Sequence, residues 1–137
     1  VYCWQSVLPL APDSLYYLTN DAIENCTVYD FQNNRAGQVY DFGRAMGKDP
    51  YELFLSGPLS LLTMENPQAQ AGRELILFRD SFGSSIAPLL ISGYSKITLV
   101  DIRYIHPDYL ARFIDFEGCD VLFLYSTLVL NNSETLK

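Results

Sequence analysis

A serine hydroxyl placed where a strand ends is the feature of this sequence with the clearest chemistry. The apolar run Leu75–Phe78 stops at the sequence Arg79–Gly83, and a segment with helical spacing follows. A strand-to-helix turn lifts a side chain out at the carboxyl edge of a sheet, where open α/β folds bind their ligands. It also points backbone N–H groups of the helix start at the same spot. We therefore expect Ser81 to be presented at a site.

Ser81 needs two kinds of help to act as a nucleophile, because a serine hydroxyl is weakly reactive at neutral pH. Oxyanion stabilisation is expected from the N–H groups of Phe82 and Gly83, which should lie unpaired at the positive end of the helix. No base is present in the turn itself, and Asp80 is expected to fix the turn by accepting backbone hydrogen bonds. A structural role for Ser81, as an ordinary helix cap, remains the alternative.

His106 is the one histidine of the chain, and it follows the second regular strand at the same predicted edge as Ser81. A Ser81–His106 pair is therefore one hypothesis. The other follows from Pro107, because a residue before proline is held in extended backbone and commonly precedes the first turn of a helix. On that interpretation His106 is a partly exposed cap of the second helix.

Metal and nucleotide sites receive little support from the motifs. The chain has no G-x-G-x-x-G and no G-K-[ST] sequence, although Ser81, Ser84 and Ser85 at a helix start form a generic anion site. Asp80 and Asp101 stand at the ends of neighbouring predicted strands, so a magnesium ion held by this pair of carboxylates is one hypothesis. The structural alternative is that these carboxylates form ion pairs with Arg79 and Arg103. The three cysteines, Cys3, Cys26 and Cys119, lack the spacing of zinc ligands. Because their number is odd, we expect at least one of them to be a free thiol. We expect neither a metal nor a cofactor.

Composition limits the partners that this protein can bind. A net charge of −7 with nine Lys and Arg residues in 137 argues against nucleic acid and against anionic membrane surfaces. No apolar run is long enough to span a bilayer. The length and the 49% hydrophobic content favour a single globular domain over residues 1–137. Since the sequence does not begin with Met, we expect it to be an incomplete part of a longer domain.

Residues 74–130 carry a β-α-β-α-β pattern. Apolar runs at 75–78, 97–100 and 121–125 predict parallel strands that are covered on both faces. Helical crossovers are expected over Ser84–Gly93, with Pro88 in an early turn, and over Pro107–Gly118. Residues expected to face the sheet are Ile86, Leu89 and Leu90 in the first helix and Leu110, Phe113 and Ile114 in the second.

The irregular segment 1–73 gives weaker signals. It contains an alternating strand candidate at Thr27–Phe31 and a helix signal at Asp49–Leu55, where Asp49 is the expected cap and Gly57 follows the end. The ten tyrosines of the whole chain, including Tyr16, Tyr17, Tyr51 and Tyr104, are candidates for a saccharide-binding groove, with buried or half-buried packing as the default for most of them.

The run from Leu75 to Leu90, continued by Tyr94–Tyr104 and Asp120–Tyr125, resembles the carboxyl-terminal half of bacterial DHHW proteins. These proteins are similar to the alginate O-acetyltransferase-like SGNH hydrolases. The similarity reaches upstream through Val39–Asp41 and Lys48–Tyr51 to Phe54–Gly57. It covers roughly residues 39 to 130, and residues 1–38 match loosely.

The resemblance implies a three-layer, flavodoxin-like α/β fold with a parallel sheet and Ser81 as nucleophile. The implied reaction is hydrolysis or transfer of an ester-linked acyl group, with a carbohydrate or acylated polymer as partner, in an extracytoplasmic or membrane-anchored protein. In the family the catalytic Asp and His come from an upstream D-x-H-W motif, which this sequence lacks, so we expect that motif before residue 1 and little activity from these residues alone. Gly57 is a further candidate oxyanion donor, although Pro58 stands near the position where the family tends to carry Asn.

A function of a different class remains open. If no D-x-H-W motif precedes residue 1, the same fold would serve as a non-catalytic envelope module that binds saccharide or a partner protein. Ser81 would then be kept as part of a turn and helix cap.

Overall fold

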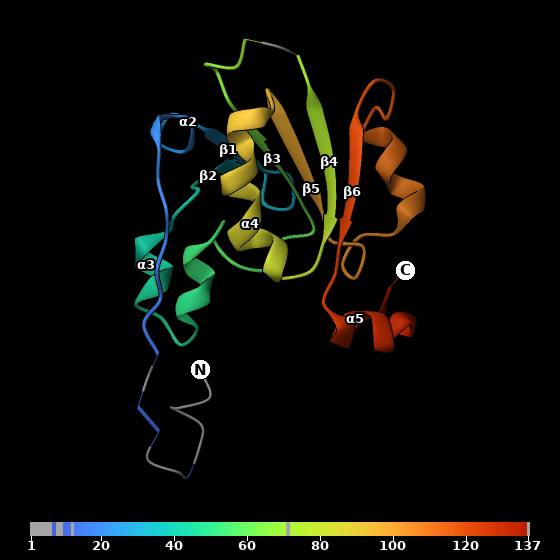
Figure 1. The fold of residues 1–137 in the computed structure, drawn as a ribbon. Coiled ribbons are helices and arrows are strands. Elements are labelled where there is room, and N and C mark those ends of the chain that lie inside the picture. Colours follow the sequence, from blue (N-terminus) through green and yellow to red (C-terminus); the bar gives the residue numbers. More distant parts are fainter. Residues whose placement is uncertain (1–6, 8–9, 12, 71, 137) are drawn as a thin grey trace.

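The computed structural model describes residues 7, 10–11, 13–70 and 72–136 (Figure 1). Within these ranges six strands form a single sheet, with helices between them. The strands are β1 (Thr27–Asp30), β2 (Arg35–Gly37), β3 (Leu61–Glu65), β4 (Glu74–Arg79), β5 (Lys96–Val100) and β6 (Asp120–Leu124). The α-helices are α2 (Asp21–Glu24), α3 (Phe42–Ala45), α4 (Phe82–Leu90) and α5 (Thr127–Asn131), and the 3-10 helices are η1 (Pro50–Leu53), η2 (Ile91–Gly93), η3 (Pro107–Arg112) and η4 (Ser133–Thr135).

The sheet has the strand order β2-β1-β3-β5-β4-β6. β4 pairs in parallel with β5 on one side and with β6 on the other, as the sequence predicts for the regular half. β1, β2 and β3 pair antiparallel, and β3 joins them to β5. The α/β class is confirmed, but the sheet is mixed and not wholly parallel, because three of its strands come from the segment expected to be irregular.

β4 is buried on both faces, which explains its continuous apolar sequence. Leu75 and Leu77 belong to the core beneath α4, which lies over one face of the sheet (Figure 1). Ile76 and Phe78 belong to a second core that contains Leu110 of η3. Alternate residues of a strand point to opposite faces, so β4 is covered by both cores. The loop after β4 therefore leaves from the middle of the parallel part of the sheet.

The first crossover differs from the predicted helix in its start and in its buried face. α4 begins at Phe82 and not at Ser84, so Pro88 lies inside the helix. The buried residues of α4 include Gly83 and Ala87, while Leu89 is exposed. The prediction for Leu89 is wrong because Gly83 packs closely on Arg79 of β4. The side of α4 that contains Gly83 and Ala87 therefore faces the sheet, in place of the side chosen from the spacing of its large apolar residues.

The second crossover is a 3-10 helix, η3, that ends six residues before the expected stop at Gly118. Leu110 and Ile114 are buried as predicted, but Phe113 is exposed. A 3-10 helix has three residues per turn, so a set of apolar residues chosen for the α-helical period does not stay on one face.

In the first half of the chain, β1 confirms the strand predicted at Thr27–Phe31, whereas β2 and β3 were not predicted. The helix predicted over Asp49–Leu55 is the shorter 3-10 helix η1, with Asp49 capping Tyr51 N–H as expected.

None of the helices in the described ranges combines the length and apolar character needed to cross a membrane. Cys26 and Cys119 are free thiols, and burial raises the pKa of Cys26 to about 11, while Cys3 lies outside the described residues.

Candidate functional site

Ser81 lies exposed at the carboxyl end of β4, directly before α4. Its backbone is already helical, with φ −58° and ψ −30°, and its side chain does not cap the helix. Among the hydrogen bonds of the described residues, neither its N–H nor its Oγ takes part in one. The hydroxyl expected at this edge is therefore presented without an internal partner, and the capping role proposed as its alternative is not the one seen.

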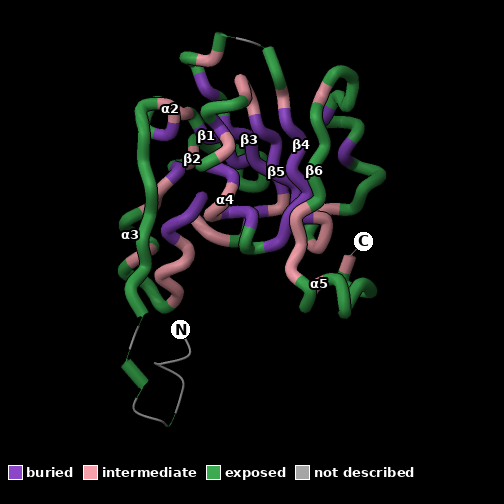
Figure 2. Tube along the Cα trace, in the orientation of Figure 1, coloured by how far each residue is buried: buried purple, intermediate pink, exposed green. Residues whose placement is uncertain are grey.

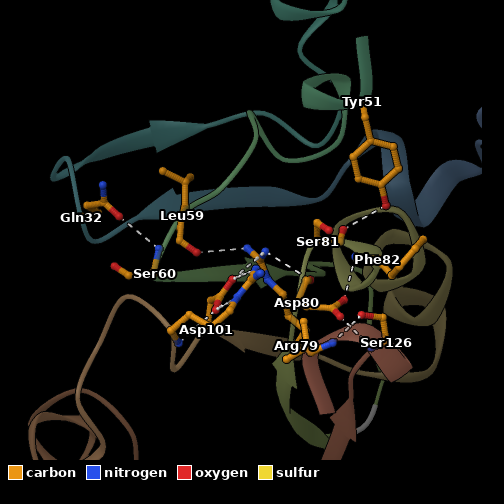
Figure 3. A network of polar contacts seen from close by, with 12 residues as sticks. Gln32, Tyr51, Leu59, Ser60, Arg79, Asp80, Ser81, Phe82, Asp101 and Ser126 are labelled. Atoms are coloured by element: carbon orange, nitrogen blue, oxygen red, sulfur yellow. Dashed lines mark hydrogen bonds and ion pairs between the residues drawn. The ribbon is translucent and has the colours of Figure 1, made fainter. Parts of the chain in front are cut away.

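Asp80 holds this turn in place, as predicted. The carboxylate is buried, its Oδ1 accepts the Phe82 N–H at 3.0 Å, and its Oδ2 accepts the Ser126 N–H at 2.6 Å (Figure 3). The Asp80 N–H donates to the Leu124 carbonyl oxygen at 3.3 Å. Asp80 thereby ties the end of β4 to the end of β6, and both of its carboxylate oxygens are occupied by backbone donors.

The N–H groups of Phe82 and Gly83 are not unpaired, so that part of the prediction is wrong. Phe82 donates to Asp80 Oδ1, and Gly83 donates to the Asp80 carbonyl oxygen at 3.1 Å. The Ser84 N–H donates to the Ser81 carbonyl oxygen at 3.1 Å. The first N–H groups of α4 thus all have acceptors within the turn, and among the described residues the Ser81 N–H is the one left free.

Gly83 has a packing role that the sequence did not reveal. A Cβ atom built on Gly83 would lie 2.4 Å from Arg79 Cβ and 2.9 Å from Arg79 Cγ. Real Cβ atoms do not approach a neighbour that closely, so only glycine lets α4 pack on the buried Arg79 side chain. The glycine of the motif is required by the protein's own core.

Tyr51 is a residue of the site that sequence analysis missed as a partner of Ser81. Its hydroxyl donates to the Ser81 carbonyl oxygen at 2.9 Å and lies 2.9 Å from Ser85 Oγ (Figure 3). Tyr51 belongs to η1, which lies 30 residues before Ser81 in the sequence. No local pattern links the two, because the contact depends on how the first half folds against the second.

Arg79 and Asp101 form a buried ion cluster beside the turn, which confirms the structural alternative for these charges. Asp101 accepts hydrogen bonds from Arg103 Nε at 2.9 Å and from Arg103 Nη2 at 2.6 Å. Arg79 Nη1 lies 3.7 Å from Asp101 Oδ2, and its Nη2 donates to the Leu59 carbonyl oxygen at 3.1 Å. Burial lowers the pKa of Arg79, whereas the hydrogen bond to Asp101 raises that of Arg103.

The magnesium pair of Asp80 and Asp101 does not fit this arrangement. Backbone N–H groups occupy both oxygens of Asp80, and the Arg103 guanidinium occupies both oxygens of Asp101. A hard cation needs free carboxylate oxygens. In the part of the chain that the structure describes, no group of three His, Cys, Asp or Glu side chains is placed to hold a metal ion.

Tyr125 adds a buried hydroxyl to the same charged cluster. Its Oη is buried and, among the described residues, has no hydrogen-bond partner. Burial and then the negative charge of Asp101 raise the pKa of Tyr125 to about 12, so the phenol stays protonated near neutral pH. It can donate a proton in a hydrogen bond but cannot serve as a base there.

The loop that contains Gly57 lies at this edge of the sheet. The Leu59 carbonyl oxygen accepts from Arg79, and the Ser60 carbonyl oxygen accepts the Asp101 N–H at 2.9 Å. Leu55, Ser56 and Gly57 all have positive φ, with values of 54°, 60° and 91°. The Gly57 N–H donates to the Phe54 carbonyl oxygen at 3.2 Å, so this predicted oxyanion donor already has a partner.

The same loop borders a cavity of about 310 Å³. Half of its lining residues have polar side chains, namely Asp30, Arg35, Gln38, Asp41 and Ser56. Asp30 is buried and accepts two hydrogen bonds from Asn33. Such a lining suits a ligand that is rich in hydroxyl groups.

His106 caps η3 and contacts its own turn. Its Nδ1 accepts the Asp108 N–H at 3.3 Å and lies 3.4 Å from Asp108 Oδ2, and its side chain is about half exposed. No contact among the described residues joins His106 to Ser81. The interpretation of His106 as a helix cap is confirmed, and the Ser81–His106 pair is not formed.

Solved structures with this fold agree with the resemblance predicted from the sequence. A DHHW family protein from Eubacterium siraeum superposes with a TM-score of 0.54 and 26% identity over 81% of this chain and 38% of its own. Bacillus cereus PatB1 superposes with a TM-score of 0.55 and 22% identity over 82% of this chain and 36% of its own, and the same protein solved with a sulfonyl adduct matches equally well.

These similarities confirm the resemblance to DHHW proteins and an α/β fold of this type. The chain spans less than two fifths of the length of each of these proteins. No protein-family model matches the chain, and no curated protein matches it.

Proposed function

We propose that Ser81 is the nucleophile of an SGNH-type serine esterase or O-acyltransferase that acts on acetyl esters of cell-envelope carbohydrate. The observation that carries this proposal is the exposed Ser81 hydroxyl, which, like the N–H of the same residue, has no hydrogen-bond partner among the described residues. A serine kept for structure would use its hydroxyl to cap the helix, as Ser126 does for α5. A carbohydrate substrate is what the resemblance to DHHW proteins implies, and the cavity beside the Gly57 loop does not have Ser81 among its lining residues.

The proposed reaction uses a base that lies outside the described residues. That base removes the Ser81 Oγ proton while Oγ attacks the carbonyl carbon of the ester, and the Ser81 N–H donates to the oxyanion that forms. Collapse of the tetrahedral intermediate breaks the bond to the alkoxide, which takes the proton from the base. Water or an acceptor hydroxyl then removes the acetyl group from Ser81 by the same steps in reverse.

Two comparisons support the proposal through the shared fold. The chain is 26% identical to a DHHW family protein over 81% of its length. Bacillus cereus PatB1, which shares the fold, has been solved with a sulfonyl adduct. An extracytoplasmic or membrane-anchored location belongs to the same proposal.

The test is turnover of an activated acetyl ester by the complete protein that contains this sequence. We expect Ser81→Ala to lower kcat/KM by about a thousandfold or more, since removal of a nucleophile abolishes the covalent step. Ser92→Ala, an exposed serine at the far end of the same helical segment, is the matched control and should keep the rate. Equal rates for Ser81→Ala and the unmodified protein would contradict the proposal.

The second candidate function is a non-catalytic module that binds saccharide or a partner protein. It is favoured by one observation, namely that no base among the described residues contacts Ser81, since His106 contacts Asp108 instead. Binding of acetylated saccharide that is unchanged by Ser81→Ala, without any turnover, would be its signature.

A further inference from the structure

β6 is an edge strand whose apolar side chains are exposed. Val121, Leu122 and Phe123 are 46%, 39% and 64% exposed. Figure 2 shows β6 as exposed for most of its length, beside the buried strands β4 and β5. An edge strand has unpaired N–H and C=O groups along its free side, which makes it a template for a further strand.

The exposure affects both faces of the sheet at this edge. Val121 and Phe123 lie next to Ile76 and Phe78 of β4 in the register, and Phe78 and Phe123 stack with 4.7 Å between ring centroids. Leu122 lies next to Leu77, on the opposite face. Ile76, Leu77 and Phe78 are buried, whereas their neighbours on β6 are exposed, so the apolar cover on each face of the sheet stops between β4 and β6.

The opposite edge of the sheet is protected in the usual way. β2 has three residues and carries the charged Arg35, and a short charged edge strand discourages further pairing. β6 has five residues, and Asp120 at its start is the one charged residue among them. A continuous apolar run of this kind is typical of a strand inside a parallel sheet, with cover on both faces.

We infer that β6 pairs with a further β-strand, and that this strand and its flanking cover belong to the same polypeptide outside the 137-residue sequence. The similar solved chains extend well beyond the region matched here, which covers 38% of the DHHW protein and 36% to 38% of the PatB1 chains. A polypeptide as long as these has ample length for a further strand and for elements that cover both faces of the sheet. The inference rests on the exposure and pairing of β6 and does not require Ser81 to be a nucleophile.

A second copy of the chain fits this edge less well. Pairing of two β6 strands would satisfy their edges but would place two strands side by side that are bare on both faces. Val121, Phe123 and Leu122 of each copy would remain without cover. The net charge of −7 on each copy would also oppose the association.

The test places a photo-crosslinking residue, p-benzoylphenylalanine, at position 123 of the complete protein. The product should keep the mass of a monomer, and peptide mass spectrometry should find position 123 joined to a peptide outside residues 1–137. The control carries the same residue at position 46, since Met46 is an apolar residue that is 88% exposed at the end of α3, and should not join that peptide. Crosslinks to a second copy, to another protein or to nothing at all would each overturn the inference.

A second measurement needs no substitution in β6. In the unmodified complete protein, amide hydrogen exchange of residues 120–124 should be at least about a hundredfold slower than that of the other edge strand, residues 35–37. The protection expected is that of a strand bonded on both sides, as in β4. Exchange of residues 120–124 at the rate of residues 35–37 would overturn the inference.

Discussion

The turns that follow β4 and β5 end at the same edge of the sheet, and each begins with a buried aspartate. After β5, Asp101 accepts three hydrogen bonds from Arg103 and lies beside the buried Arg79, so its charge is matched inside the protein. After β4, the carboxylate of Asp80 accepts hydrogen bonds from backbone N–H groups, and in the described part of the chain neither the hydroxyl nor the N–H of the next residue, Ser81, has a partner. In the turn after β5 the charged side chains pair with one another, whereas the turn after β4 presents the exposed hydroxyl of Ser81.

This difference distinguishes Asp101, whose contacts stabilise the fold, from Ser81, whose hydroxyl we propose to be reactive. Buried polar groups of a fold are normally satisfied, so a cluster such as Asp101 with its two arginines needs no functional explanation. An exposed hydroxyl on a turn that is rigidly held by Asp80 and Tyr51 is arranged differently. The following predictions test whether the two turns separate stability from reactivity in this way.

The largest effect is expected from Asp101→Asn. The substitution leaves the Arg79 guanidinium buried without a carboxylate, and breaking a buried ion pair typically costs about 3 kcal/mol or more. The free energy of unfolding, measured by urea denaturation of the complete protein, should fall by about that amount. Asp108→Asn, an exposed aspartate near His106, is the control and should change stability by less than about 0.5 kcal/mol. Equal losses for the two variants would remove the distinction between the turns.

A smaller loss is expected from Gly83→Ala. The new Cβ would overlap Arg79 Cβ, and overpacking of this kind costs about 2 kcal/mol, which exceeds the gain of about 1 kcal/mol from better helix propensity. Urea denaturation should show a net loss of about 1 kcal/mol or more. The control is Gly93→Ala, because a Cβ there meets nothing within 4 Å. If Gly83→Ala were as stable as Gly93→Ala, close packing on Arg79 would not be what fixes this turn.

Tyr51→Phe should have the smallest effect on stability and a separate effect on Ser81. Loss of one hydrogen bond to the Ser81 carbonyl oxygen costs about 1 kcal/mol, and the freed turn should present Ser81 less precisely. The measurement is the rate at which the complete protein hydrolyses an activated acetyl ester, with stability followed in parallel. Tyr104→Phe is the control, since the Tyr104 hydroxyl has no hydrogen-bond partner in the described ranges. A rate equal to that of the control would mean that Tyr51 does not position Ser81.

The regular half of the fold could be predicted because its signals are local. Continuous apolar runs identified β4, β5 and β6, and the abrupt end of the run before Asp80 placed Ser81 at the carboxyl edge. The role of Asp80 in the turn and that of His106 as a cap followed from residue types and neighbouring positions.

The remaining features depend on contacts that are distant in the sequence. β3 is a strand because β1 and β5 pair with it on its two sides. The sequence Leu61–Glu65 carries no local pattern that predicts this pairing. The buried face of α4 depends on how closely Gly83 approaches Arg79, and the contact of Tyr51 with Ser81 depends on the docking of η1. The N–H groups of Phe82 and Gly83 were predicted free because the turn was treated as the first turn of a helix, whereas Asp80 accepts both.

Reaction of the complete protein with a fluorophosphonate probe tests most directly whether Ser81 is an activated nucleophile. Peptide mass spectrometry then locates the adduct. We expect a single adduct on Ser81 that is lost in Ser81→Ala and kept in Ser92→Ala. An unlabelled protein, or an adduct on another residue that persists in Ser81→Ala, would contradict it.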